Sequence, residues 1–272
     1  MRFLYGLLVL VPIALVLEYG DLGGHAAVFV TSALAMVPLA AILGRATEEA
    51  AIYTGPKIGA LLNATLGNAA ELIITIVALR EGLVTVVKAS IAGSIIGNIL
   101  IVLGLSIFLG GLKNGTQRFD QRAAGANATM MSLAVLALVI PAVFSLPGGE
   151  SRISESDVEH LSDGVAIVII VIYVLYLAFS LRGTSPAERE QEHESETASM
   201  RLSTVIGLLA GATIAIVVMS EVLVGAIEPT AEDWGLTELF IGVMLIPIVG
   251  NIAEHLVAVQ VAIANKMDLS LG

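Results

Sequence analysis

Long apolar runs recur along the chain, and short polar segments separate them. A helix of about 20 apolar residues crosses a hydrocarbon core of about 30 Å, so such runs predict membrane helices. We predict eight: Phe3–Leu17, Ala26–Leu43, Ile58–Leu79, Leu83–Leu109, Gly125–Leu146, Val165–Leu181, Leu202–Ile227 and Leu239–Ala264. The first run is short and follows Arg2, as in a signal peptide, but no small-residue cleavage site precedes Glu18, so we expect an uncleaved span.

The composition agrees with a chain whose main solvent is lipid. Hydrophobic residues make up 57% and charged residues 14% of the 272 residues, and the mean hydropathy is +0.92, whereas about 25% of the residues of a soluble domain are charged. We therefore predict an all-α integral membrane protein. The absence of cysteine excludes disulfides and thiolate metal sites. The net charge of -11 argues against nucleic acid as a partner.

Two five-residue motifs each place a carboxylate inside an apolar run. They read Gly67-Asn68-Ala69-Ala70-Glu71 and Gly250-Asn251-Ile252-Ala253-Glu254, and they differ at one aliphatic position. Every matching pair of residues is 183 positions apart. Because a charge at bilayer depth is costly, two carboxylates in duplicated surroundings indicate one paired site.

The basic residues predict how the two motifs are oriented. With the amino terminus in the cytoplasm, ten of the 13 basic residues fall on the cytoplasmic side, and Arg80, Lys88 and Arg152 are the exceptions. The helix with Glu71 then runs outward and the helix with Glu254 runs inward, which is an inverted repeat. A second repeated pair, a hydroxyl residue followed by glutamate, precedes each motif: Thr47-Glu48 in the first half and Ser220-Glu221 in the second.

The repeat predicts a chain of two halves. Residues 1–181 form the first half with the motif at 67–71, residues 182–201 an acidic cytoplasmic linker, and residues 202–272 an incomplete second half with the motif at 250–254. The acidic excess lies mainly in Glu150–Asp163 and Glu188–Glu196. Solvated loops are the ordinary interpretation of such segments, and a cation-attracting or regulatory role is the alternative.

Polar residues at four-residue spacing predict helix faces that look into the protein. One stripe is Asn63, Gly67, Glu71 and Thr75, and a second, on the next helix, is Ser90, Ser94 and Asn98 with Gly93 and Gly97 between them. The glycines permit close helix approach, so packing with interhelical hydrogen bonds explains the two serines better than ligation does. For the two motif glutamates, ligation is the better explanation.

Glycine directly before asparagine in the middle of a span predicts local unwinding. Unwound backbone frees carbonyls that a bound cation can satisfy, and Pro247 ahead of Gly250 favours such a break in the second half. The carboxylates of Glu71 and Glu254, the amides of Asn68 and Asn251 and these carbonyls form an oxygen-rich set. Calcium takes 6–8 oxygens at about 2.3–2.6 Å, so this set, with one or two waters, suits it better than magnesium.

These residues resemble the calcium/proton exchanger family of the cation/calcium antiporter superfamily. The segments that carry the resemblance are ATEEAAIYTGPKIGALLNATLGNAAELI, VVKASIAGSIIGNILIVLGLS, MSEVLVG and PIVGNIAEHLVAVQVAIANKMDLSLG. The resemblance implies an inverted-repeat transporter bundle of eleven spans. Since the second half stops at Gly272, before any counterpart of Ser90 to Asn98, we expect about eight of those spans, with the carboxy-terminal ones missing.

The resemblance also implies roles for individual residues. Glu71 and Glu254 would be the central cation ligands, Gly67 and Gly250 the helix breaks that offer carbonyls, and Asn68 and Asn251 the borders of the site. His255 would handle protons or gate the site, and Glu48 and Glu221 would be accessory acids near the cavity mouths. From the residues alone, His255 and Glu221 are explained equally well as structural groups hydrogen-bonded within the bundle.

Two facing glutamates predict the mechanism. The empty dianionic site is unstable because the carboxylates repel each other and are poorly hydrated, so either a divalent cation or protons must neutralise it. If only the neutralised site changes access, cation and protons compete and move in opposite directions. We expect an antiporter in a prokaryotic cytoplasmic membrane that exports Ca2+ against H+, with Ca2+ as transported substrate and no cofactor; the oligomeric state stays open.

Three alternatives remain. A monovalent cation (Na+ or K+)/proton antiporter could use the same carboxylates. A membrane enzyme is a different class, but the chain has no intramembrane-protease motif, neither Gly-x-Ser-Gly nor His-Glu-x-x-His nor paired membrane aspartates. A non-transporting scaffold does not explain two glutamates in register at an offset of 183.

Overall fold

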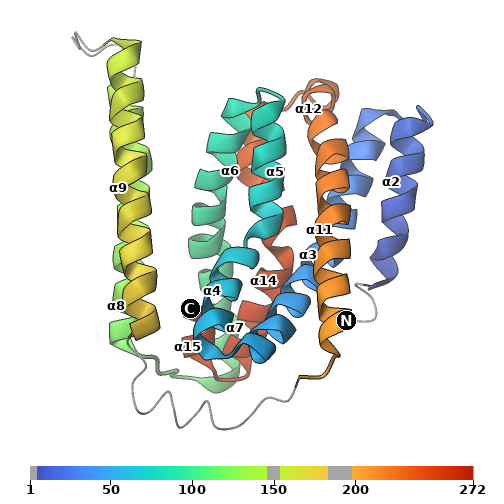
Figure 1. Ribbon diagram of the computed structural model, residues 1–272. Helices are drawn as coiled ribbons and strands as arrows, with labels where there is room; N and C mark the ends of the chain where they lie inside the picture. Colours follow the sequence, from blue (N-terminus) through green and yellow to red (C-terminus); the bar gives the residue numbers. More distant parts are fainter. Residues whose placement is uncertain (1–4, 146–153, 183–197, 272) are drawn as a thin grey trace. The chain divides into compact units, whose positions relative to one another are not determined.

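Every regular element is a helix in the residues that the computed structural model describes, which are 5–145, 154–182 and 198–271 (Figure 1). The elements, in chain order, are η1 (Leu7–Val9), α2 (Leu10–Tyr19), α3 (Gly24–Thr54), α4 (Pro56–Leu66), α5 (Ala69–Arg80), α6 (Val84–Gly97), η2 (Asn98–Leu103), α7 (Gly104–Asn114), α8 (Gln121–Phe144), α9 (Glu155–Arg182), α11 (Leu202–Gly225), α12 (Ile227–Trp234), α13 (Glu238–Phe240), η3 (Ile241–Leu245), α14 (Ile246–Ile263) and α15 (Met267–Leu271). The predicted all-α class is confirmed.

Five described helices are long and apolar enough to cross a membrane. They are Gly24–Thr54, Val84–Asn114, Gln121–Phe144, Ser156–Ala178 and Leu202–Trp234. A sixth candidate is the pair Glu238–Ile252 and Glu254–Ile263, which is bent by 65°. The two remaining predicted runs are also helical, but one is the short α2 and the other is divided into α4 and α5. The division within Ile58–Leu79 falls at Gly67 and Asn68, where local unwinding was predicted.

The chain forms two compact units, and each is described by itself. Unit 1 contains Met1–Gln117 and Glu196–Ser270, and unit 2 contains Arg118–Ser195 and Leu271–Gly272. The two units are groups of residues that contact one another, whereas the predicted halves are defined by the repeated sequence motif. The division at residues 182–201 therefore stays a prediction, and most of that segment lies outside the described residues.

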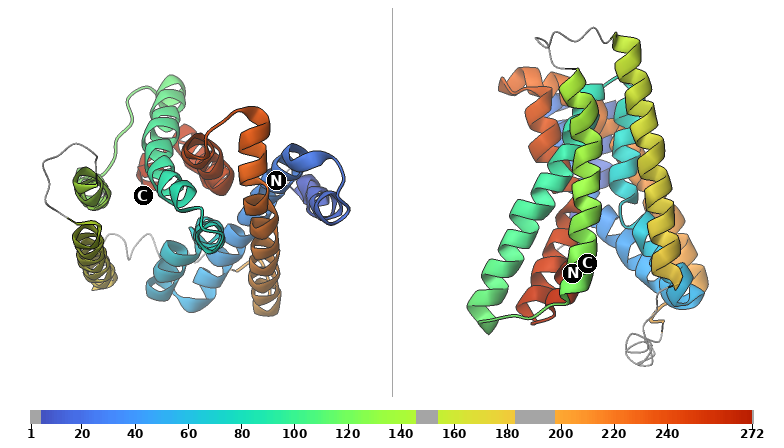
Figure 2. Two further views of the ribbon diagram at one scale, coloured as in Figure 1. Left: turned by 90° about the horizontal axis from the view of Figure 1, so that it is seen from above. Right: turned by 90° about the vertical axis from the view of Figure 1, so that its left-hand side faces the viewer.

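The core of unit 1 lies between two long helices, α3 and α11. Viewed end-on, they lie side by side with α2 on the outside (Figure 2). Large side chains of both helices are fully buried there, among them Met36, Leu43, Ile216, Met219 and Leu223. α3 also packs on α14, and α11 packs on α5. Each long helix therefore supports the motif helix of the other repeat.

Hydroxyl groups buried in α3 are satisfied by their own helix. Ser32 donates to the Val28 carbonyl at 2.7 Å, and Thr47 donates to the Leu43 carbonyl at 2.9 Å. Since lipid offers no hydrogen-bond partners, such bonds let polar residues sit inside a membrane helix.

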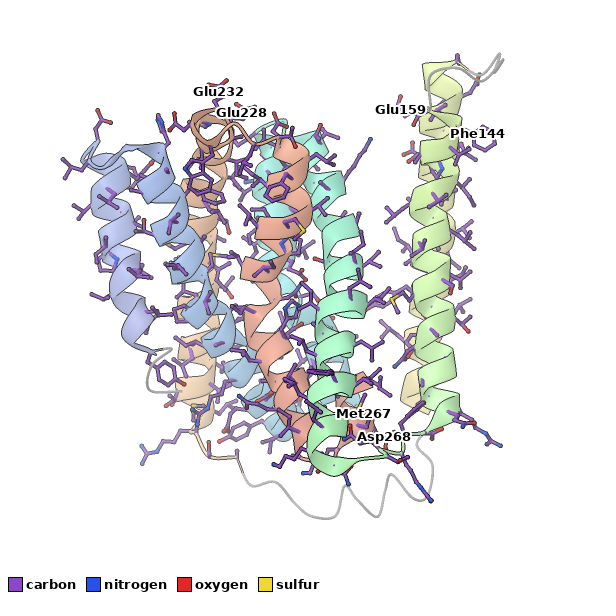
Figure 3. The ribbon with its side chains drawn as sticks, turned by 180° about the vertical axis from the view of Figure 1, so that it is seen from behind. Phe144, Glu159, Glu228, Glu232, Met267 and Asp268 are labelled. Atoms are coloured by element: carbon purple, nitrogen blue, oxygen red, sulfur yellow. The ribbon has the colours of Figure 1, made fainter. Side chains whose placement is uncertain are left out.

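The first motif interrupts its helix, as predicted. α4 ends at Leu66, α5 begins at Ala69, and Gly67 and Asn68 form the turn between them. In Figure 1 the chain rises from α4 to α5. It descends through η3–α14, because α12, which precedes this pair, lies at the top and α15, which follows it, lies at the bottom (Figures 1 and 3). The two motif helices are therefore antiparallel, as an inverted repeat requires.

The repeat is visible in the backbone where α5 and α14 end. Gly82 follows α5 with φ 80° and Asn265 follows α14 with φ 64°, and these residues are 183 positions apart. The bonds that close the first helix are Glu81 N to Val77 O at 3.1 Å, Gly82 N to Leu79 O at 3.2 Å and Leu83 N to Ala78 O at 2.9 Å. Those that close the second are Ala264 N to Gln260 O at 3.0 Å, Asn265 N to Ala262 O at 3.0 Å and Lys266 N to Val261 O at 2.9 Å. Each donor and acceptor recurs at the same offset, so the sequence register continues past the motifs as a repeated helix end.

Unit 2 is built around the helices α8 and α9. The Asp120 side chain caps α8 by accepting from the backbone N–H of Arg122 at 2.7 Å. Tyr176 of α9 donates its hydroxyl to the Asn127 side-chain oxygen of α8 at 3.4 Å. None of the predicted site residues lies in this unit.

Candidate cation site

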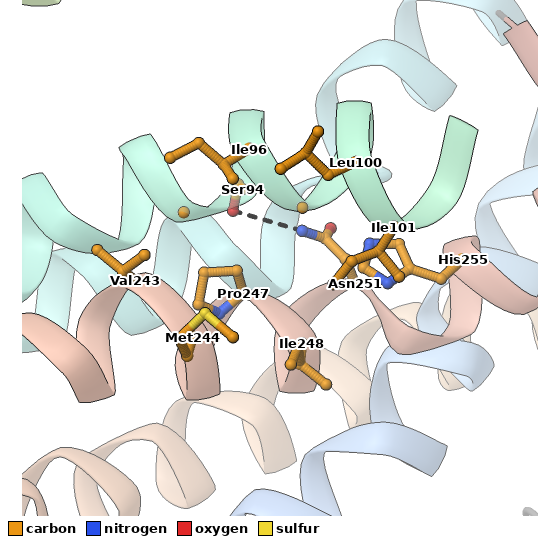
Figure 4. A pocket seen from close by; sticks show the side chains of 12 residues that line it. Ser94, Ile96, Leu100, Ile101, Val243, Met244, Pro247, Ile248, Asn251 and His255 are labelled. Carbon is orange, nitrogen blue, oxygen red and sulfur yellow. Dashed lines mark hydrogen bonds between the residues drawn. The ribbon is translucent and has the colours of Figure 1, made fainter. Parts of the chain in front are cut away.

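Glu71 is the best-connected of the predicted site residues. It lies in the first turn of α5, directly after the break, where the helix N-terminus favours a negative charge. Its Oε1 accepts from the Ser94 hydroxyl of α6 at 2.7 Å and from the Asn251 amide of α14 at 2.5 Å. Asn251 Nδ2 is also 3.4 Å from Ser94 Oγ, as the dashed line in Figure 4 shows. Three helices therefore converge on one carboxylate oxygen.

The two motif glutamates lie against each other's glycines. A Cβ placed on Gly250 would come within 2.9 Å of Glu71 Cγ, and a Cβ placed on Gly67 would come within 3.5 Å of Glu254 Oε1. This exchange of contacts is what an inverted repeat produces at its symmetry axis. The structure thus brings together the pair that the sequence predicted.

A close crossing of α6 and η3 supports this arrangement. A Cβ on Gly93 would clash with the Val243 carbonyl and would lie 2.7 Å from Pro247 Cγ. On the opposite side of the crossing, a Cβ on Gly242 would lie 2.9 Å from the Val86 carbonyl. Two glycines therefore let the backbones approach closely enough for Ser94 to reach the motif helices.

His255, one turn after Asn251, contacts Asn98, one turn after Ser94. His255 Nε2 and Asn98 Oδ1 are 3.1 Å apart, and which of the two donates depends on the tautomer of the imidazole. His255 lines a cavity of about 150 Å³ between α6–η2 and η3–α14, and Ser94 and Asn251 form the rest of its polar wall (Figure 4). The rest of its wall is mostly aliphatic.

The two motif asparagines have different surroundings. Asn251 is 2% exposed and bonded to Glu71, whereas Asn68, at the start of α5, is exposed. The difference arises because α6 lies beside α14 at this level and supplies Ser94. Ser90 lies one turn earlier on α6 and is buried.

The second motif does not break its helix at Gly250, contrary to expectation. α14 is continuous from Ile246 to Ile263, and the bend falls between Ile252 and Glu254. Pro247 lies in the first turn of α14, where its missing N–H costs least, and the π-helix η3 directly precedes that turn. The irregularities of this helix therefore lie on either side of Gly250, in η3 before it and in the bend after Ile252.

Glu48 and Glu221 are exposed and lie near the carboxyl ends of α3 and α11, at opposite ends of unit 1 (Figure 1). Their neighbour Glu49, which was not among the predicted site residues, is only 7% exposed. Helical spacing was the available signal, because Glu49 falls on the buried face that carries Leu43 and Ala46.

Within the described residues, no three or more His, Cys, Asp or Glu side chains gather as a metal site. A cation at the paired glutamates would therefore need further oxygens from amides, hydroxyls or backbone, which are the ligand types that calcium accepts.

An all-helical membrane bundle with two antiparallel, repeat-related motif helices defines an inverted-repeat transporter. The chain belongs to the sodium/calcium exchanger protein family, since that family's model matches residues 24–182 and 204–272. Two similar curated proteins are a Ca(2+)/H(+) antiporter of Aphanothece halophytica, 44% identical over 283 residues, and the Ca(2+)/H(+) antiporter ChaA of Bacillus subtilis, 44% identical over 255 residues. These alignments cover 98% and 90% of this chain, and 75% and 70% of the relatives.

Solved structures of similar fold include two Ca2+/H+ exchange proteins. Native YfkE superposes with a TM-score of 0.80 at 37% identity, covering 98% of this chain and 75% of that one. The H+/Ca2+ exchanger CAX gives a TM-score of 0.72 at 19% identity, covering 99% of this chain and 68% of that one, which supports the fold alone.

Proposed function

We propose that this protein is a secondary active antiporter that exchanges Ca2+ for H+ at the Glu71–Glu254 pair. The observation that carries the proposal is the reciprocal contact in which each glutamate lies against the glycine of the opposite repeat. Relatives named Ca(2+)/H(+) antiporters, 44% identical over most of the chain, support the choice of ions.

Glu71 is held ready for a cation by groups that can change roles. The Ser94 hydroxyl and the Asn251 amide donate to Glu71 Oε1. Both side chains also carry an oxygen acceptor. When Ca2+ enters, rotation of the hydroxyl and of the amide turns these oxygens toward the ion. The same residues therefore stabilise the carboxylate before binding and add ligands afterwards.

Competition for the carboxylates couples the two ions. Ca2+ requires both glutamates to be ionised, whereas protons remove the same charges, so binding of one excludes the other. A site that changes access only when neutralised then moves Ca2+ and H+ in opposite directions. In the cell, with the amino terminus in the cytoplasm, this exchange would export Ca2+ across a prokaryotic cytoplasmic membrane. Ca2+ is the transported substrate, and the proposal involves no cofactor or catalysed reaction.

Transport by the 272-residue chain in proteoliposomes tests the proposal. Vesicles loaded at acidic pH and diluted into neutral buffer with radioactive Ca2+ should accumulate the ion, and a protonophore should abolish the uptake. Glu71→Gln and Glu254→Gln keep the side-chain size but remove the charge, and each should reduce uptake to the level of empty vesicles. Uptake that survives either substitution would contradict the paired site.

Two additions complete the experiment. Gly211→Ala, in α11, is the control variant, because nothing lies within 4 Å of a Cβ at that position, and it should transport normally. Excess Na+ should leave Ca2+ uptake unchanged. Proton-driven Na+ uptake that Ca2+ does not inhibit would overturn the proposed selectivity.

A further inference from the structure

Glu49 is a buried carboxylate for which the exchange mechanism has no use. It lies near the carboxyl end of α3 and is 7% exposed. Its partners come from residues 150 or more positions later, directly ahead of α11. Glu49 Oε2 accepts from the backbone N–H of Ser199 at 2.9 Å and of Met200 at 3.3 Å, and Oε1 accepts from the Ser199 hydroxyl.

Tyr53 lies one helical turn after Glu49 and donates a hydrogen bond to the same segment instead of accepting one. Its hydroxyl donates to the Met200 carbonyl at 2.5 Å. The two α3 side chains thus hold both the N–H and the C=O of Met200. Because most of these bonds go to backbone, they fix the path of the chain as it enters α11.

The location of this contact gives it a mechanical consequence. α3 packs against α14, which carries Glu254, and α11 packs against α5, which carries Glu71. A link between the end of α3 and the start of α11 therefore joins the two supports of the cation site. We infer that Glu49 and Tyr53 are positioning residues that tie α3 and α11 into one body, which holds together through the exchange cycle.

The alternative is a latch that opens once in each cycle. Opening would leave a buried carboxylate without its three donors, which is costly, whereas the access states of a transporter differ little in energy. A permanent tie avoids that penalty. The inference rests on the proposed exchange, but the tie itself can be tested without transport.

The structural test uses the absence of cysteine from the chain. Met200→Cys introduces a single thiol and keeps the backbone groups that Glu49 and Tyr53 bind. A water-soluble maleimide should label this thiol roughly tenfold faster when Glu49→Ala is added, because the segment ahead of α11 loses its anchor. Thr54→Ala is the matched control, since that hydroxyl bonds within α3, to the Ala50 carbonyl at 3.1 Å. Equal labelling rates in all three proteins would overturn the tie.

The functional test asks whether a covalent link replaces the carboxylate. In Glu49→Cys/Ser199→Cys, exchange should have a maximum rate about tenfold below wild type, with the half-saturating Ca2+ concentration within about twofold, because no site ligand changes. A short, reducible bis-methanethiosulfonate cross-linker should restore the rate, and reduction should remove it again.

The possible outcomes separate the proposals. Cross-linked protein that is inactive while the reduced form works would show a latch and overturn the tie. Equal rates with and without the linker would also overturn it. If wild-type protein shows no Ca2+/H+ exchange, the proposed function fails, and the maleimide rates still decide whether Glu49 anchors the segment.

Discussion

Glu71 lies directly against the backbone of Gly250, because a Cβ on that glycine would come within 2.9 Å of Glu71 Cγ. We predict that Gly250→Ala displaces the carboxylate from Ser94 and Asn251. Overpacking of this kind costs about 1–3 kcal/mol, so Ca2+ should bind about tenfold more weakly or worse. Isothermal titration of the purified protein with Ca2+ measures the change.

The control for this substitution is Gly211→Ala, where the added methyl group meets nothing within 4 Å. It should bind Ca2+ as wild type does. Unchanged affinity in Gly250→Ala would mean that Glu71 does not ligate the ion from the position seen here.

A second substitution tests the helix crossing. Gly93→Ala would push a methyl group into the Val243 carbonyl, which is backbone and cannot turn aside. We predict a loss of about 1–3 kcal/mol in stability and a lower midpoint of thermal unfolding in detergent. Gly97→Ala, one turn along α6, meets nothing within 4 Å and should be neutral or stabilising. If both variants unfold at the same temperature, the close crossing is absent in solution.

The hydroxyl of Ser94 offers a milder perturbation. Ser94→Ala removes one of the two donors to Glu71 Oε1. A hydrogen bond to a charged group contributes about 1.5–3 kcal/mol, so Ca2+ affinity should fall by a factor of about 10 to 100. Ser132→Ala is the matched change, since that hydroxyl bonds the Ala128 carbonyl of its own helix at 2.8 Å. Equal affinities in the two variants would exclude Ser94 from the site.

Apparent Ca2+ affinity should weaken as the pH falls, since protons and Ca2+ occupy the same carboxylates. In the range where the pair is protonated, the logarithm of the affinity should rise with pH by up to about two per unit, one for each proton displaced. Glu71→Gln leaves one titrating partner and should reduce the slope to about one. Ca2+ titrations at several pH values measure both slopes. The same slope in both proteins would mean that Glu71 is not one of the competing groups.

The sequence was sufficient to locate the site helices and their relation. Apolar runs predicted where the helices lie, and the offset of 183 between Gly67 and Gly250 predicted an antiparallel pair. The same offset relates Gly82 to Asn265, which share a left-handed conformation, and glycine and asparagine are the residues that most often adopt it after a helix. The break at Gly67 was predictable because glycine disfavours a helix interior.

The features that the sequence did not predict depend on contacts between helices that are far apart in the chain. Asn251 and Asn68 occupy equivalent motif positions, but only Asn251 has α6 beside it to complete a bonded group around Glu71. Glu49 and Glu48 are adjacent acids, and only packing against the residues ahead of α11 makes the first a buried anchor. The bend after Ile252 falls at neither a glycine nor a proline, so the sequence contains no local signal for its position.

The unequal motif helices bear on the resting state of the transporter. One motif helix is divided by a turn at Gly67 and Asn68, whereas the other is a single helix that is bent by 65° after Ile252. Identical halves would make the inward-open and outward-open forms equal in energy by symmetry. Because the two motif helices are irregular at different positions, that degeneracy is lifted, and one access state is lower in energy than the other.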